Sequence, residues 1–98
     1  MGNIIKQIEK YLLANGFREI IVEGDKEFIY NGHIYVISQS KDMVYLECAE
    51  NLEEAAKNMY EDIAAYDLDK GESYIISSLK NDITKHIIVE NLLFVKQG

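Results

Sequence analysis

The stretch from Glu27 to Cys48, EFIYNGHIYVISQSKDMVYLEC, decides the fold of this chain. Runs rich in β-branched and aromatic residues lie on both sides of Asn31-Gly32. Asn-Gly between such runs is the strongest short-range signal of a β-hairpin, because both residues tolerate the positive φ that a type I′ turn demands. A two-residue turn sets the register of this hairpin as Tyr30–His33, Ile29–Ile34 and Phe28–Tyr35.

Further runs of the same kind extend the hairpin into an antiparallel meander. The four predicted strands are Glu19–Glu23, Glu27–Tyr30, His33–Ser38 and Met43–Cys48. If the connection between the last two has an odd number of residues, Ile34 faces Leu46 and Val36 faces Val44, which makes one face wholly aliphatic. The other face is then mixed and carries Phe28, Tyr30, His33, Tyr35, Ile37, Met43 and Tyr45.

A helix is predicted before the meander, over Ile4–Asn15, because its apolar residues repeat with a helical period. Asn3 is placed to cap the first turn, since its side-chain oxygen can accept from an unpaired amide. Gly16 is placed to end the helix, because glycine adopts the left-handed conformation at little cost. Phe17 can then fold back on the last turn.

The part after the meander predicts two more helices. Asn51 and Glu54 stand in capping-box positions before an apolar periodicity that runs over Leu52–Tyr66. A helix over Ser73–His86 follows, although its first turn also suits a strand, and Ile87–Val95 is predicted as a last strand. The expected fold is a single α+β domain over residues 1–98, with a four-stranded antiparallel meander.

Composition favours a protein of a reducing compartment. The 98 residues contain one cysteine and no proline, and 48% of them are hydrophobic, which is ordinary globular composition. A single cysteine excludes an internal disulfide, and secreted domains of this size usually need one. Neither a secretion signal nor an apolar run of about 20 residues is found. We therefore expect a soluble, cytoplasmic protein.

The net charge of −7 is concentrated in one quarter of the chain. Residues 1–46 hold six acids and five bases, and residues 73–98 hold two acids and three bases. The segment 47–72 holds nine acids against Lys57 and Lys70, a local charge of −7. Like charge disfavours nucleic acid and anionic membranes as partners of this segment. A basic protein surface is the favoured partner.

No catalytic, cofactor or metal site is predicted. Asp67-Leu68-Asp69-Lys70-Gly71 has the start of a calcium loop, but an EF-hand requires glycine at the sixth position and a glutamate at the twelfth. Those positions are Glu72 and Ser78. The two histidines, His33 and His86, have no second ligand at metal-binding spacing. Cys48 ends an apolar strand and is expected to be buried and inert, although a Cys48–His pair made by the fold stays open.

In layout, the chain resembles small acidic bacterial toxin-immunity proteins. The features that carry the resemblance are the helix closed by Asn15-Gly16-Phe17, the hairpin at Asn31-Gly32 and the acidic run Ala49–Ala56. A second similarity, through Tyr35–Ser38 and the acidic half, is to small phage proteins that inhibit RNA-guided nucleases. Both resemblances imply a non-enzymatic inhibitor that presents carboxylates to a basic cleft of a toxin or nuclease.

The sequence thus predicts an acidic protein that neutralises a basic protein partner. Carboxylates would steer the partner and bond its lysines and arginines, and some of the seven tyrosines would anchor it. The predicted partner-binding residues are Glu50, Glu53, Glu54, Glu61, Asp62, Tyr66, Asp67, Asp69 and Glu72. The alternative is a small enzyme or ligand-binding module that uses the mixed sheet face. A deep pocket beside His33 or Cys48 would support this alternative.

Overall fold

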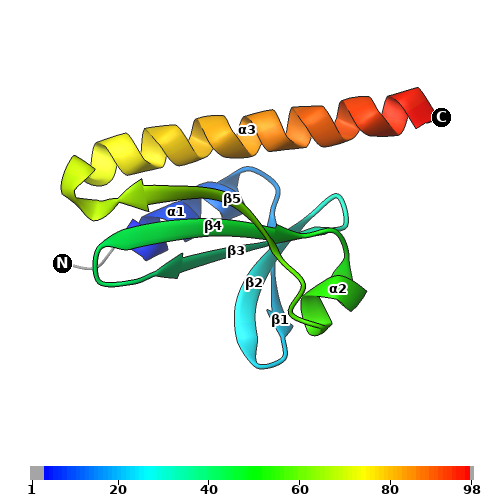
Figure 1. The fold of residues 1–98 in the computed structure, drawn as a ribbon, viewed down its shortest axis with the longest axis horizontal. Coiled ribbons are helices and arrows are strands. Elements are labelled where there is room, and N and C mark those ends of the chain that lie inside the picture. Colours follow the sequence, from blue (N-terminus) through cyan, green and yellow to red (C-terminus); the bar gives the residue numbers. More distant parts are fainter. Residues whose placement is uncertain (1–3, 98) are drawn as a thin grey trace.

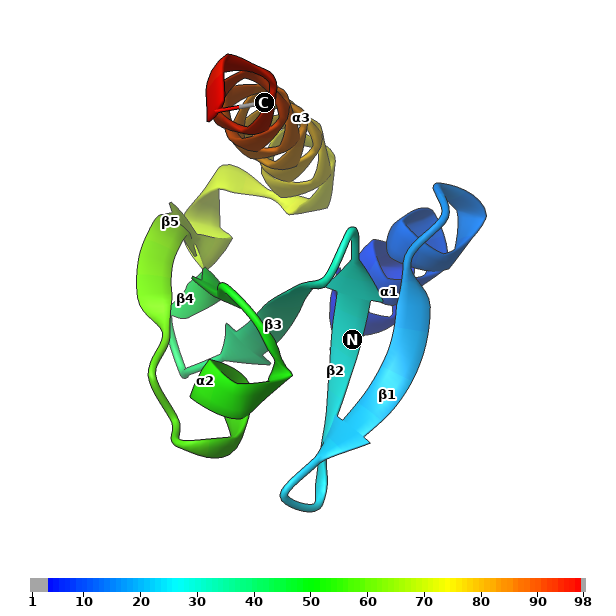
Figure 2. The same ribbon diagram turned by 90° about the vertical axis from the view of Figure 1, so that its right-hand side faces the viewer.

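Five antiparallel strands form one sheet in sequence order, and helices α1 and α3 lie across the same face of it (Figures 1 and 2). The computed structural model describes the backbone of residues 4–97 and the side chains of residues 4–89. The elements are α1 (Ile4–Ala14), β1 (Arg18–Val22), β2 (Asp25–Tyr30), β3 (His33–Gln39), β4 (Met43–Ala49), α2 (Leu52–Ala56), β5 (Glu61–Asp67), the short 3₁₀ helix η1 (Leu68–Lys70) and α3 (Glu72–Gln97). The α+β class and the antiparallel sheet are as predicted, whereas the sheet has a fifth strand.

The β2–β3 hairpin has the register that Asn31-Gly32 predicts. Phe28, Ile29 and Tyr30 pair with Tyr35, Ile34 and His33. Both turn residues have positive φ, 52° at Asn31 and 82° at Gly32, as a type I′ turn requires.

The β3–β4 register differs from the predicted one. The turn has an even count: the Ser40 amide donates to the Met43 carbonyl over 2.9 Å, so that only Lys41 and Asp42 lie between them. Ile37 therefore pairs with Leu46, and Ile34 pairs with Ala49. Because side chains alternate between faces, this change moves every residue of β4 to the opposite face. The predicted wholly aliphatic face is wrong.

The resulting core lies between the sheet and the two long helices. Its strand residues come from β2, β3, β4 and β5, and its helical residues come from α1 and α3. Members with no more than 2% exposure are Ile8, Leu12, Phe28, Tyr35, Val44, Leu46, Ile75, Leu79 and Ile83. A smaller cluster on the other face joins Val22, Ile34 and Ala49 to Ala55 of α2.

Helix α1 confirms the predicted first helix to within one residue. Gly16 takes a φ of 92°, and the Phe17 amide donates to the Leu12 carbonyl over 3.1 Å, which closes the last turn. Asn3, the predicted cap, lies outside the described residues.

The predicted helix over Leu52–Tyr66 is wrong in its second half. Asn51 caps the first turn as predicted, with its side-chain oxygen accepting from the Glu54 amide at 2.9 Å. The helix then ends at Ala56, and Asn58 adopts a φ of 60°. Residues 61–67 form β5 at the edge of the sheet, where β4 offers hydrogen bonds to a whole strand.

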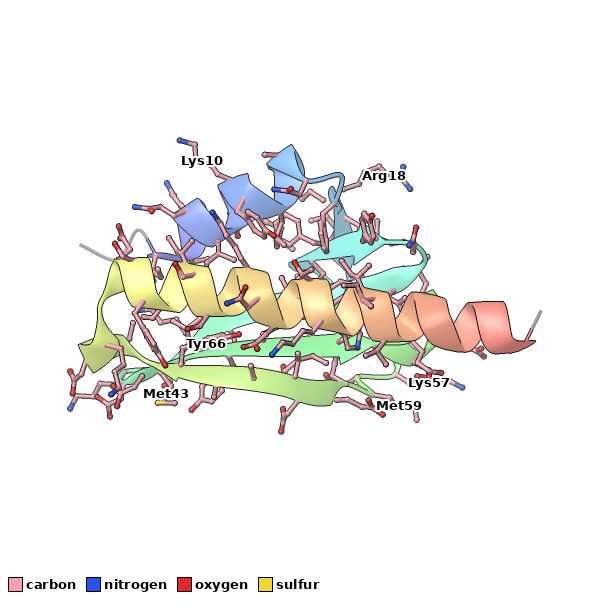
Figure 3. The ribbon with its side chains drawn as sticks, turned by 90° about the horizontal axis from the view of Figure 1, so that it is seen from above. Lys10, Arg18, Met43, Lys57, Met59 and Tyr66 are labelled. Carbon is pink, nitrogen blue, oxygen red and sulfur yellow. The ribbon has the colours of Figure 1, made fainter. Side chains whose placement is uncertain are left out.

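Helix α3 contains the predicted helix Ser73–His86 and continues to Gln97. The predicted last strand, Ile87–Val95, is therefore wrong, since its backbone extends α3. Figure 1 shows that the C-terminal part of α3 runs past the sheet. In the N-terminal half of α3, Asp82 accepts a hydrogen bond from the Tyr66 hydroxyl of β5 over 2.6 Å, which holds α3 to the sheet edge. Tyr66 is labelled in Figure 3.

Candidate functional site

The predicted partner-binding residues fall into two groups at opposite ends of β5. At one end, Glu50 precedes α2, Glu53 and Glu54 belong to α2, and Glu61 and Asp62 begin β5. At the other end lie Tyr66, Asp67, Asp69 and Glu72. A strand rises about 3.3 Å per residue, so β5 separates the groups by about 20 Å. Met59 and Met43, labelled in Figure 3, mark these two ends.

In the second group, Tyr66, Asp67 and Glu72 make side-chain contacts within the chain, and Asp69 contributes its backbone amide. Tyr66 is only 5% exposed and donates to Asp82, so it is not part of the surface. Asp67 accepts from the Asp69 amide over 2.9 Å and thereby caps η1. Glu72 accepts from the Gln7 side chain over 2.8 Å. These residues join β5, η1 and α3 to their neighbours.

Three residues of the first group, Glu50, Glu54 and Glu61, line a hollow beside α2. The hollow has a volume of about 330 Å³ and is lined by Cys48, Glu50, Glu54, Met59, Tyr60 and Glu61. Three carboxylates, a phenol ring and an exposed thioether suit a cationic side chain better than a neutral or anionic one. The Cys48 side chain itself is buried.

A carboxylate of β2 lies beneath this region. Glu27 is 5% exposed and accepts from the Tyr60 hydroxyl over 2.6 Å. Burial raises the pKa of Glu27, and the charge of Asp25 adds to the effect, whereas the bond from Tyr60 opposes it. Burial and the bond to Glu27 also raise the pKa of Tyr60. The pair fixes the position of the segment between α2 and β5.

A second pair of acids lies on the sheet beside α2. Glu47 of β4 is directly opposite Asp62 of β5. Partial burial raises the pKa of Glu47, and the hydrogen bond and charge of Asp62 raise it further. Like charges directly opposite each other destabilise a sheet, so this pair costs folding free energy.

Few cations neutralise these acids. Among the described side chains, salt bridges join Lys57 to Glu53 over 3.6 Å and Lys26 to Glu9 over 3.4 Å. The first is an exposed i, i+4 pair of small energetic value. No described lysine or arginine lies within salt-bridge distance of Glu27, Glu47 or Asp62.

The histidines lie on the helix-covered side of the sheet. The Tyr35 hydroxyl and His86 Nδ1 are 2.9 Å apart, and the centres of the His33 and His86 rings are 6.3 Å apart. Within the described residues, no three His, Cys, Asp or Glu side chains come together in a way that could hold a metal ion.

Sequence reasoning missed Glu47, Tyr60 and Glu27 as members of this site. One signal for Glu47 was available in β4. There the apolar residues Val44, Leu46 and Cys48 alternate with Tyr45 and Glu47, and this alternation indicates the face of the sheet on which Glu47 lies. Once the register was misjudged, that signal pointed to the wrong face. The approach of Glu27 to Tyr60 joins residues 33 positions apart, and no local pattern indicates it.

Helices that could cross a membrane were sought in the described residues, and none has the required length and apolar character. Comparisons of the chain with family models, with curated proteins and with solved structures found no match.

Proposed function

We propose that this protein binds a basic protein partner and neutralises it without catalysis, as an immunity protein does with a cognate toxin. The observation that carries the proposal is the group of acids around α2 and the start of β5, of which only Glu53 forms a salt bridge among the described side chains. This group, here called the acidic end, consists of Glu47, Glu50, Glu53, Glu54, Glu61 and Asp62.

Unneutralised carboxylates at one end of a molecule have two physical consequences. Their field attracts a positively charged protein and raises its association rate, an effect that salt weakens. In the complex, each carboxylate can accept charge-assisted hydrogen bonds from lysine or arginine. The hollow beside Tyr60 and Met59 gives such a side chain an aromatic and apolar wall.

Charge reversal tests this proposal. A partner would first be identified by pull-down from the native host or by co-expression with the product of the neighbouring gene. We expect Glu53→Lys with Glu54→Lys to weaken its binding by several kcal/mol, because like charges would then face each other. The cost in folding should be about 0.3–1 kcal/mol for each residue, since both acids favour the N-terminus of α2. Titration calorimetry at several salt concentrations measures the affinity.

The control is Glu19→Lys with Glu23→Lys, which changes the net charge equally but acts on exposed residues at β1. This control should bind nearly as well as the unaltered protein. Equal binding by all three proteins, with no effect of salt, would show that the acidic end is only a solvated surface.

A further inference from the structure

Within the part of the chain that the structure describes, part of the sheet has no helix over it. Helices α1 and α3 lie on one face, and on the opposite face α2 packs mainly against β1, β3 and β4 and makes little contact with β5. Figure 2 shows α2 at one end of this face. The open part, here called the uncovered face, consists of Val36, Ser38, Tyr45, Glu47, Asp62 and Ala65.

The side chains of the uncovered face make it shallow, with one aromatic ring at its middle. Tyr45 is 37% exposed and lies between Ser38 of β3 and Ala65 of β5, which are both small. In the next row, Glu47 lies between Val36 and Asp62. Tyrosine is enriched at the centre of protein interfaces, and so is arginine, which could pair with these two acids.

An irregularity in the sheet creates the charged row. Leu46 pairs with Ala64, so a regular register would place Glu47 opposite Ile63. A β-bulge between Leu46 and Glu47 shifts the pairing by one residue, and Glu47 meets Asp62 instead. Bulges re-aim side chains and are frequent beside functional sites. Here the bulge puts two carboxyl groups side by side at a cost in stability.

We propose, on the basis of the function proposed above, that the uncovered face is the centre of the partner interface and that Glu47 and Asp62 together receive one arginine of the basic partner. Cβ atoms of opposite residues lie about 4.5–5.5 Å apart, so one planar guanidinium reaches both carboxylates. The arginine turns a repulsive pair into an attractive one. Tyr45 packs against the apolar part of the same side chain.

The test uses the full chain, labelled with ¹⁵N, and a synthetic oligo-arginine peptide as the probe. Amide shifts are followed by NMR at low ionic strength for the unaltered protein, for Glu47→Gln and for Asp62→Asn. We expect saturable shifts centred on Tyr45, Glu47 and Asp62, and an affinity lower by at least about tenfold in either variant. The variants should melt at the same or a higher temperature, because like-charge repulsion is relieved. Glu53→Gln measures the contribution of α2 and should lower the affinity less than Glu47→Gln does. Glu19→Gln, which alters an exposed acid of β1 outside the acidic end, is the matched control and should change the affinity little.

Two results would overturn the inference in different ways. In the first, the shifts centre on α2, and the affinity falls in Glu53→Gln but not in Glu47→Gln or Asp62→Asn. The uncovered face would then not be the centre of the interface, whereas the proposed function would still stand. Absence of saturable shifts anywhere in the protein would overturn both. A lysine peptide of equal length should bind more weakly than the arginine peptide, because it lacks the planar fork that spans two carboxylates.

Discussion

Among single residues, Glu27 is the most unusual in its surroundings. Glutamate is almost never fully buried unless it is paired, yet Glu27 is 5% exposed and accepts a hydrogen bond from the neutral hydroxyl of Tyr60. The raised pKa of Glu27 follows from this burial. The hydroxyl therefore compensates a large desolvation cost, and the pair holds the segment after α2 against the sheet.

Removing that hydroxyl should destabilise the fold. We expect Tyr60→Phe to lower the free energy of unfolding by about 1–3 kcal/mol, because a buried carboxyl loses its hydrogen-bond donor. Urea denaturation at neutral pH measures the change. Tyr45→Phe, which removes a hydroxyl from the uncovered face, is the control and should have an effect within about 0.5 kcal/mol. Equal stability of the two variants would show that the Glu27–Tyr60 bond contributes nothing.

The thiol of Cys48 should be inert in the folded protein. Cys48 is buried, and its Sγ atom lies 3.5 Å from the Ala49 carbonyl oxygen. Reaction with a thiol reagent should be slow in buffer and rapid in denaturant, because only exposed thiolate reacts. A fast reaction under native conditions would contradict this expectation and would reopen the possibility of catalysis.

At the scale of elements, the sequence predicted the turns and helix ends that are determined by a few adjacent residues. Asn31-Gly32 predicted a hairpin and its register, Gly16 predicted the end of α1, and Asn51 predicted the start of α2. Each of these features depends on a few adjacent residues whose backbone or side-chain oxygen determines the outcome.

Elements that depend on distant parts of the chain could not be predicted in this way. The apolar spacing that suggested a helix over Leu52–Tyr66 includes Leu52 and Met59, which are 54% and 55% exposed. Residues 61–67 instead complete an edge of the sheet, and hydrogen bonding to β4 overrides helical spacing. In the acidic end, the sequence predicted Glu50, Glu53, Glu54, Glu61 and Asp62 as binding residues, but it predicted neither Glu47 nor the bulge that pairs Glu47 with Asp62.

The contribution of helix α3 to stability should come only from the residues that face the core. Leu79 is fully buried, whereas Ile88 of the same helix is 51% exposed. We expect Leu79→Ala to cost about 2–5 kcal/mol, since it removes buried methyl groups and leaves a cavity. Ile88→Ala should cost far less, and urea denaturation of both variants tests the difference. Equal losses would mean that Ile88 is buried in solution, for example against another molecule.

For the whole molecule, the main physical feature is the uneven distribution of charge. The segment 47–72 carries the equivalent of the entire net charge of −7, and the acidic end lies at one end of β5. Figure 3 places Lys10 and Arg18 on the side of α1 and β1, away from β5. The field of such a molecule attracts positively charged molecules to one side.

The burial of two carboxyl groups, those of Glu27 and Glu47, should make stability depend on pH. The pKa values of Glu27 and Glu47 are raised above the ordinary 4.5, so the folded protein holds these protons at a pH where the unfolded chain has released them. Stability must then fall as pH rises through the folded-state pKa values, because the native state binds more protons. We expect a larger free energy of unfolding near pH 5 than near pH 8, and a weaker dependence in Glu47→Gln. Glu53→Gln, which alters an exposed acid, should keep the full dependence. Chemical denaturation at a series of pH values measures this, and a stability that rises between pH 5 and pH 8 would contradict the assignment of the two carboxyl groups.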